Sequence, residues 1–134
     1  MSSPVDTQSM TEIISTDVAP AAVGAFSQGT ATDDLVFTAG QIPLTPDGDL
    51  RDGAGIDVQT EQALENLEAV LAEAGVGLED VLKVTVYLDD IGDFEAMNTT
   101  YEAFFEEEPP ARSAVGVDEL PKGVGVEIEA IAAK

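Results

Sequence analysis

One basic side chain, Arg112 in the stretch PPARSAV, has the residue type and setting for chemistry. The chain has 134 residues, of which 27 are Asp or Glu and five are Lys or Arg, so its formal net charge is -22. Arg112 follows a double proline and stands at the start of an apolar, strand-like run. A guanidinium binds a carboxylate through two parallel hydrogen bonds, so Arg112 can hold a small organic acid. A structural salt bridge to one of the many acids is the alternative role.

Two glutamates in the last apolar run, VGVEIEAIAA, are the next candidates. Residues alternate there, so Val126 and Ile128 face one side while Glu127 and Glu129 face the other. A solvated strand face explains both glutamates, because exposed acids are the rule. If Glu127 lies near Arg112 in space, its carboxylate can instead hold and polarise a water. An arginine, an acid and backbone groups then make a minimal site for hydrolysis.

The composition excludes several classes of site and partner. The chain has no cysteine and no histidine, which excludes disulfides, Ser-His-Asp or Cys-His catalysis and zinc bound through nitrogen or sulfur side chains. Hydrolysis by an arginine and an acid needs neither a metal nor a cofactor, and we expect none. Binding to nucleic acid or to anionic membranes depends on lysine and arginine, so the charge argues against both as partners.

Three further residues have more than one simple explanation. Gly40, followed by Gln41 within a strand-like run, indicates a bulge or a close approach of the backbone, for example to a ligand. Asn98 in the second expected helix has the residue type of a surface or capping amide. Phe26, between two glycines, is explained most simply as a core or interface residue.

The order of elements that must position these residues is strands, helix, strand, helix, strands. The clearest helix is expected over residues 57–75, with Asp57 as N-cap and Gly75 as the stop. The second helix begins near Asp93 and cannot pass the double proline. The strands are expected at 11–15, 34–44 (one bent or two short), 80–90, 112–117 and 124–133.

This order predicts an α/β (α+β) domain with one mixed sheet and two helices on one face. The other face is left without cover, which predicts association with further copies and ligand clefts between them. We expect a disordered tail over residues 1–10 and the domain over 11–134. No signal peptide or membrane span is expected, and the dispersed acids are typical of a cytoplasmic protein adapted to high salt.

Five segments, in order over nearly the whole chain, together resemble the RidA (YjgF) family of reactive-intermediate deaminases. The resemblance implies a chorismate-mutase-like fold assembled as a homotrimer, with the active sites in clefts between subunits. It also implies hydrolysis of imine and enamine acids such as 2-aminoacrylate to 2-keto acids and ammonia, without a cofactor. The segments are APAAVGAFSQG, FTAGQIPL, VLKVTVYLDDIGDFEAMNTTYEAFF, PPARSAVGV and LPKGVGVEIEAIA.

The resemblance also implies roles for individual residues. The carboxylate-binding arginine falls on Arg112, and the acid associated with the attacking water falls on Glu127. The cleft asparagine falls on Asn98, and the glycine that lines the ligand falls on Gly40. A cleft tyrosine of many members is replaced here by Phe26, which is retained as a substrate-binding candidate.

Two more positions depart from the family pattern. Ala39 stands where a serine often precedes the glycine, and Ala114 stands where a cysteine often follows Arg-Ser. Catalysis by water needs no cysteine, but the lost hydroxyls leave a second possibility open. That possibility is a non-catalytic, ligand-binding or chaperone-like trimer of the same fold. A ribonuclease or translation inhibitor is a third possibility, which the charge and the lack of histidine disfavour.

Overall fold

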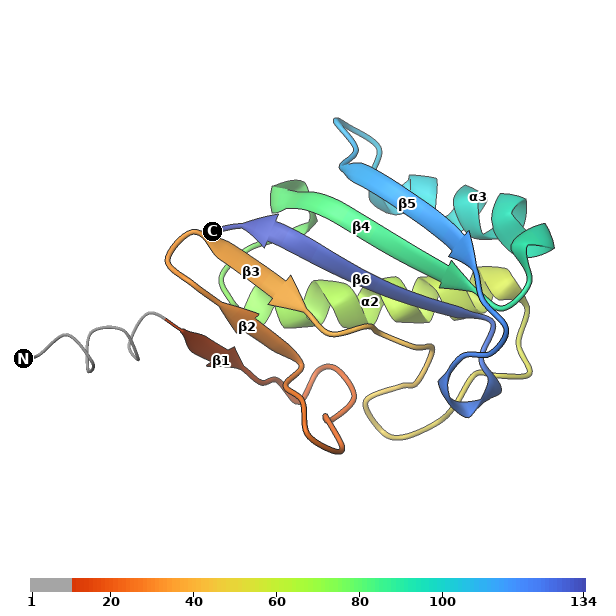
Figure 1. The fold of residues 1–134 in the computed structure, drawn as a ribbon, viewed down its shortest axis with the longest axis horizontal. Coiled ribbons are helices and arrows are strands. Elements are labelled where there is room, and N and C mark those ends of the chain that lie inside the picture. Colours follow the sequence, from red (N-terminus) through yellow and green to blue (C-terminus); the bar gives the residue numbers. More distant parts are fainter. Residues whose placement is uncertain (1–10) are drawn as a thin grey trace, which may run out of the picture.

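The fold is one mixed sheet, seen in a computed structural model that describes residues 11–134. The tail predicted for residues 1–10 lies outside the described residues. The strands lie in the order β1-β2-β3-β6-β4-β5, and all neighbours are antiparallel except β4 and β5 (Figure 1). The strands are β1 (Glu12–Ile14), β2 (Gly29–Ala31), β3 (Leu35–Thr38), β4 (Val81–Leu88), β5 (Ala111–Gly116) and β6 (Val126–Ala133).

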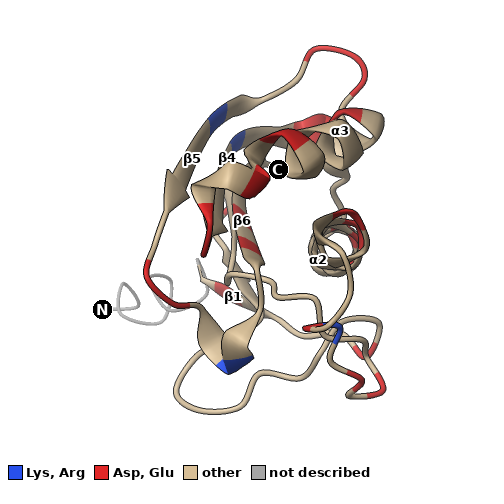
Figure 2. Cartoon of the chain, turned by 90° about the vertical axis from the view of Figure 1, so that its right-hand side faces the viewer, with Lys and Arg blue, Asp and Glu red and all other residues tan. Residues whose placement is uncertain are grey.

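Both α-helices of the described residues, α2 (Ile56–Glu73) and α3 (Phe94–Phe104), lie on the same face of the sheet (Figure 2). Helix α3 connects the parallel strands β4 and β5, as parallel pairing requires a crossover. The predicted α+β domain with two helices on one face is confirmed. Over residues 11–134 each helix is too short or too polar to cross a membrane.

The core follows the two periodicities of the sequence. Alternate residues of β4 and β6 point toward the helices, while α2 buries one stripe of its surface. The fully buried side chains include Leu64, Leu67 and Leu71 of α2, Val84, Val86 and Leu88 of β4, and Val126 and Ile128 of β6.

The predicted beginning of α2 is wrong by two residues, whereas its end is right. Gly55 is the N-cap, and Asp57 lies inside the first turn, where its charge favours the helix dipole. Gly75 follows the C-cap Ala74 with φ = 84°, a left-handed conformation that suits glycine and ends the helix.

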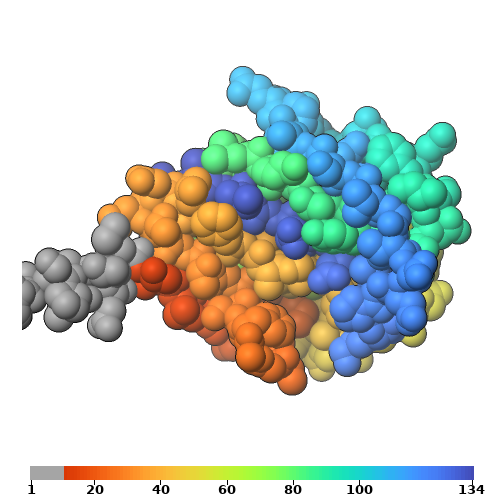
Figure 3. All heavy atoms as spheres, in the orientation of Figure 1, coloured from red at the N-terminus to blue at the C-terminus, as the bar shows by residue number. Residues whose placement is uncertain are grey.

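The opposite face of the sheet has no helical cover among the described residues. Figure 3 looks onto this face, where β3, β6, β4 and β5 are directly visible. Glu127 and Glu129 of β6 face outward here, opposite Tyr87 and Thr85 of β4 in the strand register. The association expected from this uncovered face, and the homotrimer that the family resemblance implies, stay predictions.

Buried amide side chains hold the loops that surround the sheet. Asn66 of α2 donates from Nδ2 to the carbonyl oxygens of Ile42 and Leu44, at 3.0 and 2.8 Å. Gln28 receives a hydrogen bond from the backbone N–H of Thr16 and donates to carbonyls of the segment 16–20. These bonds supply partners for backbone groups of the loops, and the Ile42 carbonyl also accepts from the Leu44 N–H at 2.7 Å.

We expect Asn66→Ala to lower the free energy of unfolding by about 2 kcal/mol, because the Leu44 carbonyl loses its donor and the Ile42 carbonyl loses one of two. Gln62→Ala is the matched control, since Gln62 is half-buried and donates only to Asn66 Oδ1. Its expected cost is at most about 1 kcal/mol. Urea unfolding at one fixed protein concentration measures both, and equal costs would contradict the role of Asn66.

Candidate functional site

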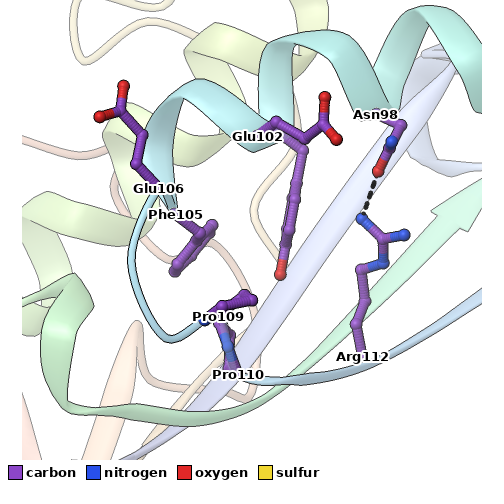
Figure 4. A pocket seen from close by; sticks show the side chains of 8 residues that line it. Asn98, Glu102, Phe105, Glu106, Pro109, Pro110 and Arg112 are labelled. Atoms are coloured by element: carbon purple, nitrogen blue, oxygen red, sulfur yellow. Dashed lines mark hydrogen bonds between the residues drawn. The ribbon is translucent and has the colours of Figure 1, made fainter.

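Arg112 lies on the edge strand β5, on the side of the sheet that the helices cover. In the β4–β5 register it pairs with Val84, whose side chain is fully buried beneath the helices. Paired residues of neighbouring strands share a face, so the Arg112 side chain points toward α3. Figure 4 shows Arg112 and Asn98 pointing toward each other from β5 and α3.

The Arg112 guanidinium has one amide partner and two aromatic neighbours. Nη1 donates to Oδ1 of Asn98 at 2.7 Å. The guanidinium carbon lies 4.6 Å from the centre of the Tyr101 ring and 5.3 Å from the centre of the Phe94 ring. Among residues 11–134 no carboxylate pairs with Arg112, so the structural salt bridge considered above is not found there.

A cavity of about 650 Å³ opens beside this guanidinium (Figure 4). Its wall combines the guanidinium with aromatic and proline rings, and these groups suit a small anion with an apolar part. Two carboxylates also belong to the wall. The lining residues are Asn98, Tyr101, Glu102, Phe105, Glu106, Pro109, Pro110 and Arg112.

A second cavity, of about 500 Å³, contains the other predicted site residues. Phe26, Gly40 and Glu127 all line it, together with Ala39 and Lys122. The rest of the wall is mainly apolar or backbone: Pro20, Ala21, Val23, Gln28, Gln41, Ile42, Leu44 and Pro121.

Gly40 and Glu127 are in direct contact in this second cavity. A Cβ atom at Gly40 would lie 2.8 Å from Cδ of Glu127, so any larger residue displaces the carboxylate. The close approach predicted at Gly40 is therefore present, with a side chain as the neighbour. Phe26 is 55% exposed in the single chain, which excludes the core as its location.

The environment of Glu127 favours its protonated form. Partial burial is the main cause that raises the pKa of this carboxyl, and the negative charge of Glu129 adds to it. A raised pKa makes the carboxylate a better proton acceptor near neutral pH.

A single chain does not bring Arg112 and Glu127 together. Arg112 and Asn98 line one cavity on the helix side of the sheet. Glu127 pairs with Tyr87 on the uncovered side and lines the other cavity with Phe26 and Gly40. The predicted site residues thus form two separate groups on opposite faces of the sheet.

Sequence reasoning missed the side chains that surround Arg112. Phe94 and Tyr101 have the residue type and helical spacing of core residues, yet both contact the guanidinium. Phe94 lies four residues before Asn98 and Tyr101 lies three residues after it. This spacing puts all three on one helix face, and it was the sequence signal that could have found them. Lys122 also lines the second cavity, and its backbone has φ = 59°. In the sequence, the scarcity of basic residues was the one feature that pointed to it.

We expect the Glu127 carboxyl to titrate above its ordinary value of 4.5. Glu129→Gln should lower the midpoint without abolishing the shift, because burial is the larger cause. Carbon-13 NMR of labelled glutamate carboxyls measures this, and Glu119→Gln, at an exposed position, should change nothing. A midpoint at or below 4.5 would contradict the burial argument.

The same shift fixes the sign of a pH effect on stability. The folded state binds the proton of the Glu127 carboxyl more tightly than the unfolded state does, so this proton stabilises the fold most below pH 4.5. The stabilisation is lost as the pH rises through the raised pKa. Glu127→Gln should therefore gain stability over the wild type at pH 7 and lose that advantage at pH 4.

Known proteins resemble this chain over nearly its whole length. A profile of the family described as Endoribonuclease L-PSP matches residues 16–134. A 2-iminobutanoate/2-iminopropanoate deaminase of Salmonella typhimurium is 44% identical over 131 residues, which cover 93% of this chain and 99% of that protein. A RutC family protein of Pyrococcus abyssi is 48% identical over 124 residues, covering 92% of this chain and 97% of that protein.

Solved structures agree with this assignment. The YjgF gene product of E. coli superposes with a TM-score of 0.86 at 43% identity, covering 92% of this chain and 98% of that one. E. coli TdcF with bound serine has a TM-score of 0.88 at 41% identity, with the same coverage. The chain therefore belongs to the Endoribonuclease L-PSP family, the YjgF/RidA family that its sequence resembles.

Proposed function

We propose that the protein hydrolyses 2-imino and enamine acids of the 2-aminoacrylate type to 2-keto acids and ammonia. The observation that carries the proposal is Arg112, which has no carboxylate partner among the described residues of a chain with net charge -22. Its guanidinium borders a cavity large enough for such an acid. The deaminase names of the Salmonella and E. coli relatives support this choice of reaction.

Arg112 binds the substrate carboxylate in this proposal. A guanidinium has five N–H donors, and Asn98 accepts one hydrogen bond from Nη1. Asn98 Oδ1 is the acceptor that Arg112 has among the hydrogen bonds of the described residues, so the Nε and Nη2 donors remain for a carboxylate. Two parallel bonds fix both the position and the plane of the substrate.

Glu127 acts on the water. The enamine first tautomerises to the imine, whose carbon is electrophilic once the nitrogen is protonated. The Glu127 carboxylate accepts a proton as the water oxygen bonds to this carbon, forming a carbinolamine. That proton passes to the nitrogen, the C–N bond breaks and ammonia leaves, while the hydroxyl proton returns to the Glu127 carboxylate as the carbonyl forms. The raised pKa of Glu127 supports these proton transfers.

Two copies of the chain are needed to complete such a site. Arg112 and Asn98 of one copy would face Phe26, Gly40 and Glu127 of the next. The separation of these groups on opposite faces of the sheet supports this arrangement, as does the uncovered face. We propose the closed homotrimer, in which each copy contributes both half-sites.

Binding without catalysis is the alternative function, and one observation favours it. Phe26 and Ala39 line the second cavity beside Glu127, and neither has a hydroxyl to hold a water. A similar protein, TdcF, has been solved with bound serine, a small amino acid. Nucleic acid is not among the proposed partners, because Lys and Arg are few and scattered along the chain (Figure 2).

We expect Arg112→Ala to lower kcat/KM by about 100-fold, because the charged hydrogen bonds to the substrate are lost. The assay is release of keto acid from 2-aminoacrylate generated in situ, corrected for spontaneous hydrolysis. Arg51→Ala makes the same change in net charge at an exposed site and should leave the rate unchanged. Equal rates for Arg112→Ala and the wild type would remove Arg112 from the mechanism. Calorimetric binding of 2-ketobutyrate without turnover by the wild type would favour the binding function.

Mixing two inactive variants tests the shared site. One variant carries Arg112→Ala and the other carries Glu127→Gln, and the two are refolded together in equal amounts. Random assembly should place an intact Arg112 against an intact Glu127 in about a quarter of the sites, so about a quarter of wild-type activity should return. Each variant refolded alone is the control. Recovery of no activity would show that the two residues do not meet across an interface.

A further inference from the structure

We propose that Tyr101 and Phe94 are positioning residues, whose ring faces hold Arg112 away from the glutamates of its own cavity. This inference rests on the proposed function, in which Arg112 binds the substrate carboxylate. It concerns how one guanidinium stays available in a chain with 27 acidic residues.

The contacts come from one side of one helix. Phe94, Asn98 and Tyr101 are separated by four and three residues on α3, so they lie on the same helix face. The guanidinium carbon is 5.3 Å from the Phe94 ring centre and 4.6 Å from the Tyr101 ring centre. Asn98 adds a hydrogen bond of 2.7 Å to Nη1. Three contacts from a rigid element define both the place and the direction of the side chain.

The Tyr101 ring is itself fixed. It is 4% exposed, and it packs on Phe105 with ring centres 4.6 Å apart and an angle of 31° between the planes. Its hydroxyl is buried and makes no hydrogen bond of ordinary geometry among the described residues, so the ring face is the part that contacts Arg112. Burial raises the pKa of Tyr101, whereas the charge of Arg112 and its approach to the phenol oxygen oppose this, so the phenol stays neutral.

Two carboxylates belong to the wall of the same cavity. Glu102 and Glu106 line the cavity with Arg112, both are exposed, and neither forms an ion pair with it. Exposed ion pairs are weak, whereas cation–π contacts strengthen as the cation loses water. Two rings and an amide therefore outweigh the nearby acids, and the guanidinium remains free for an anion that enters the cavity.

The test removes the ring faces and keeps apolar side chains in their place. We expect Tyr101→Leu and Phe94→Leu each to raise KM for the imine by about 10-fold and to weaken calorimetric binding of 2-ketobutyrate to match. The kcat should change by less than about 2-fold, because the reacting atoms are not touched. Tyr101→Phe keeps the ring and is the matched control, with KM within about 2-fold of the wild type.

A rescue experiment separates positioning from a general loss of structure. In the Tyr101→Leu background, Glu102→Gln with Glu106→Gln should recover most of the lost affinity, because the competing carboxylates are gone. The same two glutamine substitutions in the wild-type background should lower KM by much less. The difference between their effects in the two backgrounds measures the coupling between the Tyr101 ring and the two glutamates. A purely structural role of Tyr101 predicts no such rescue.

The outcomes also distinguish this inference from the proposed function. If Arg112→Ala binds 2-ketobutyrate as well as the wild type, the proposed function fails. If Arg112→Ala loses binding while both leucine variants keep the wild-type KM, only the positioning role is overturned. Should Tyr101→Leu not fold, Phe94→Leu and its glutamine rescue carry the test, because the Phe94 ring is half-buried.

Discussion

Among the described residues the guanidinium of Arg112 pairs with no carboxylate, in a molecule whose acids outnumber its bases by 27 to five. Its partners are neutral groups, an amide oxygen and two ring faces, all on α3. Neutral partners orient a guanidinium without cancelling its charge, whereas a carboxylate would do both. The crossover from β4 to the parallel strand β5 places α3 so that this helix face lies over the arginine.

The sheet separates the chemistry into two halves. Its covered face holds the group that can bind an anion, and its uncovered face holds Glu127, close against Gly40. A pleated strand sends neighbouring residues to opposite faces, and in this chain the two groups line separate cavities. Association of copies through the uncovered face would resolve the separation. It would also place the partly buried Glu127 and Glu129 carboxyls within an interface, where the cost of burying charge grows.

Much of the fold could be predicted from the sequence, because its signals are local. The alternation in VGVEIEAIAA correctly separates Val126 and Ile128 from Glu127 and Glu129. Gly75 ends α2 as predicted, since its left-handed conformation is a property of the single residue. Asp57 was wrongly assigned as the N-cap because Gly55 has no side chain to signal a cap. Of the candidate site, Arg112 and Glu127 stood out by residue type and position, and the family resemblance gave roles to Asn98, Gly40 and Phe26. Neither source gave the grouping of these residues into two cavities.

The sequence by itself determined the charge, the absence of histidine and cysteine, and the face that each strand residue takes relative to its neighbours. These properties need only composition and a repeat of two or 3.6 residues. The tertiary structure alone decided that Arg112 turns toward Phe94 and Tyr101, that Glu127 lies over Gly40, and that the two groups are apart. Such contacts join residues distant in the chain, and they depend on strand order and register, which no local pattern encodes.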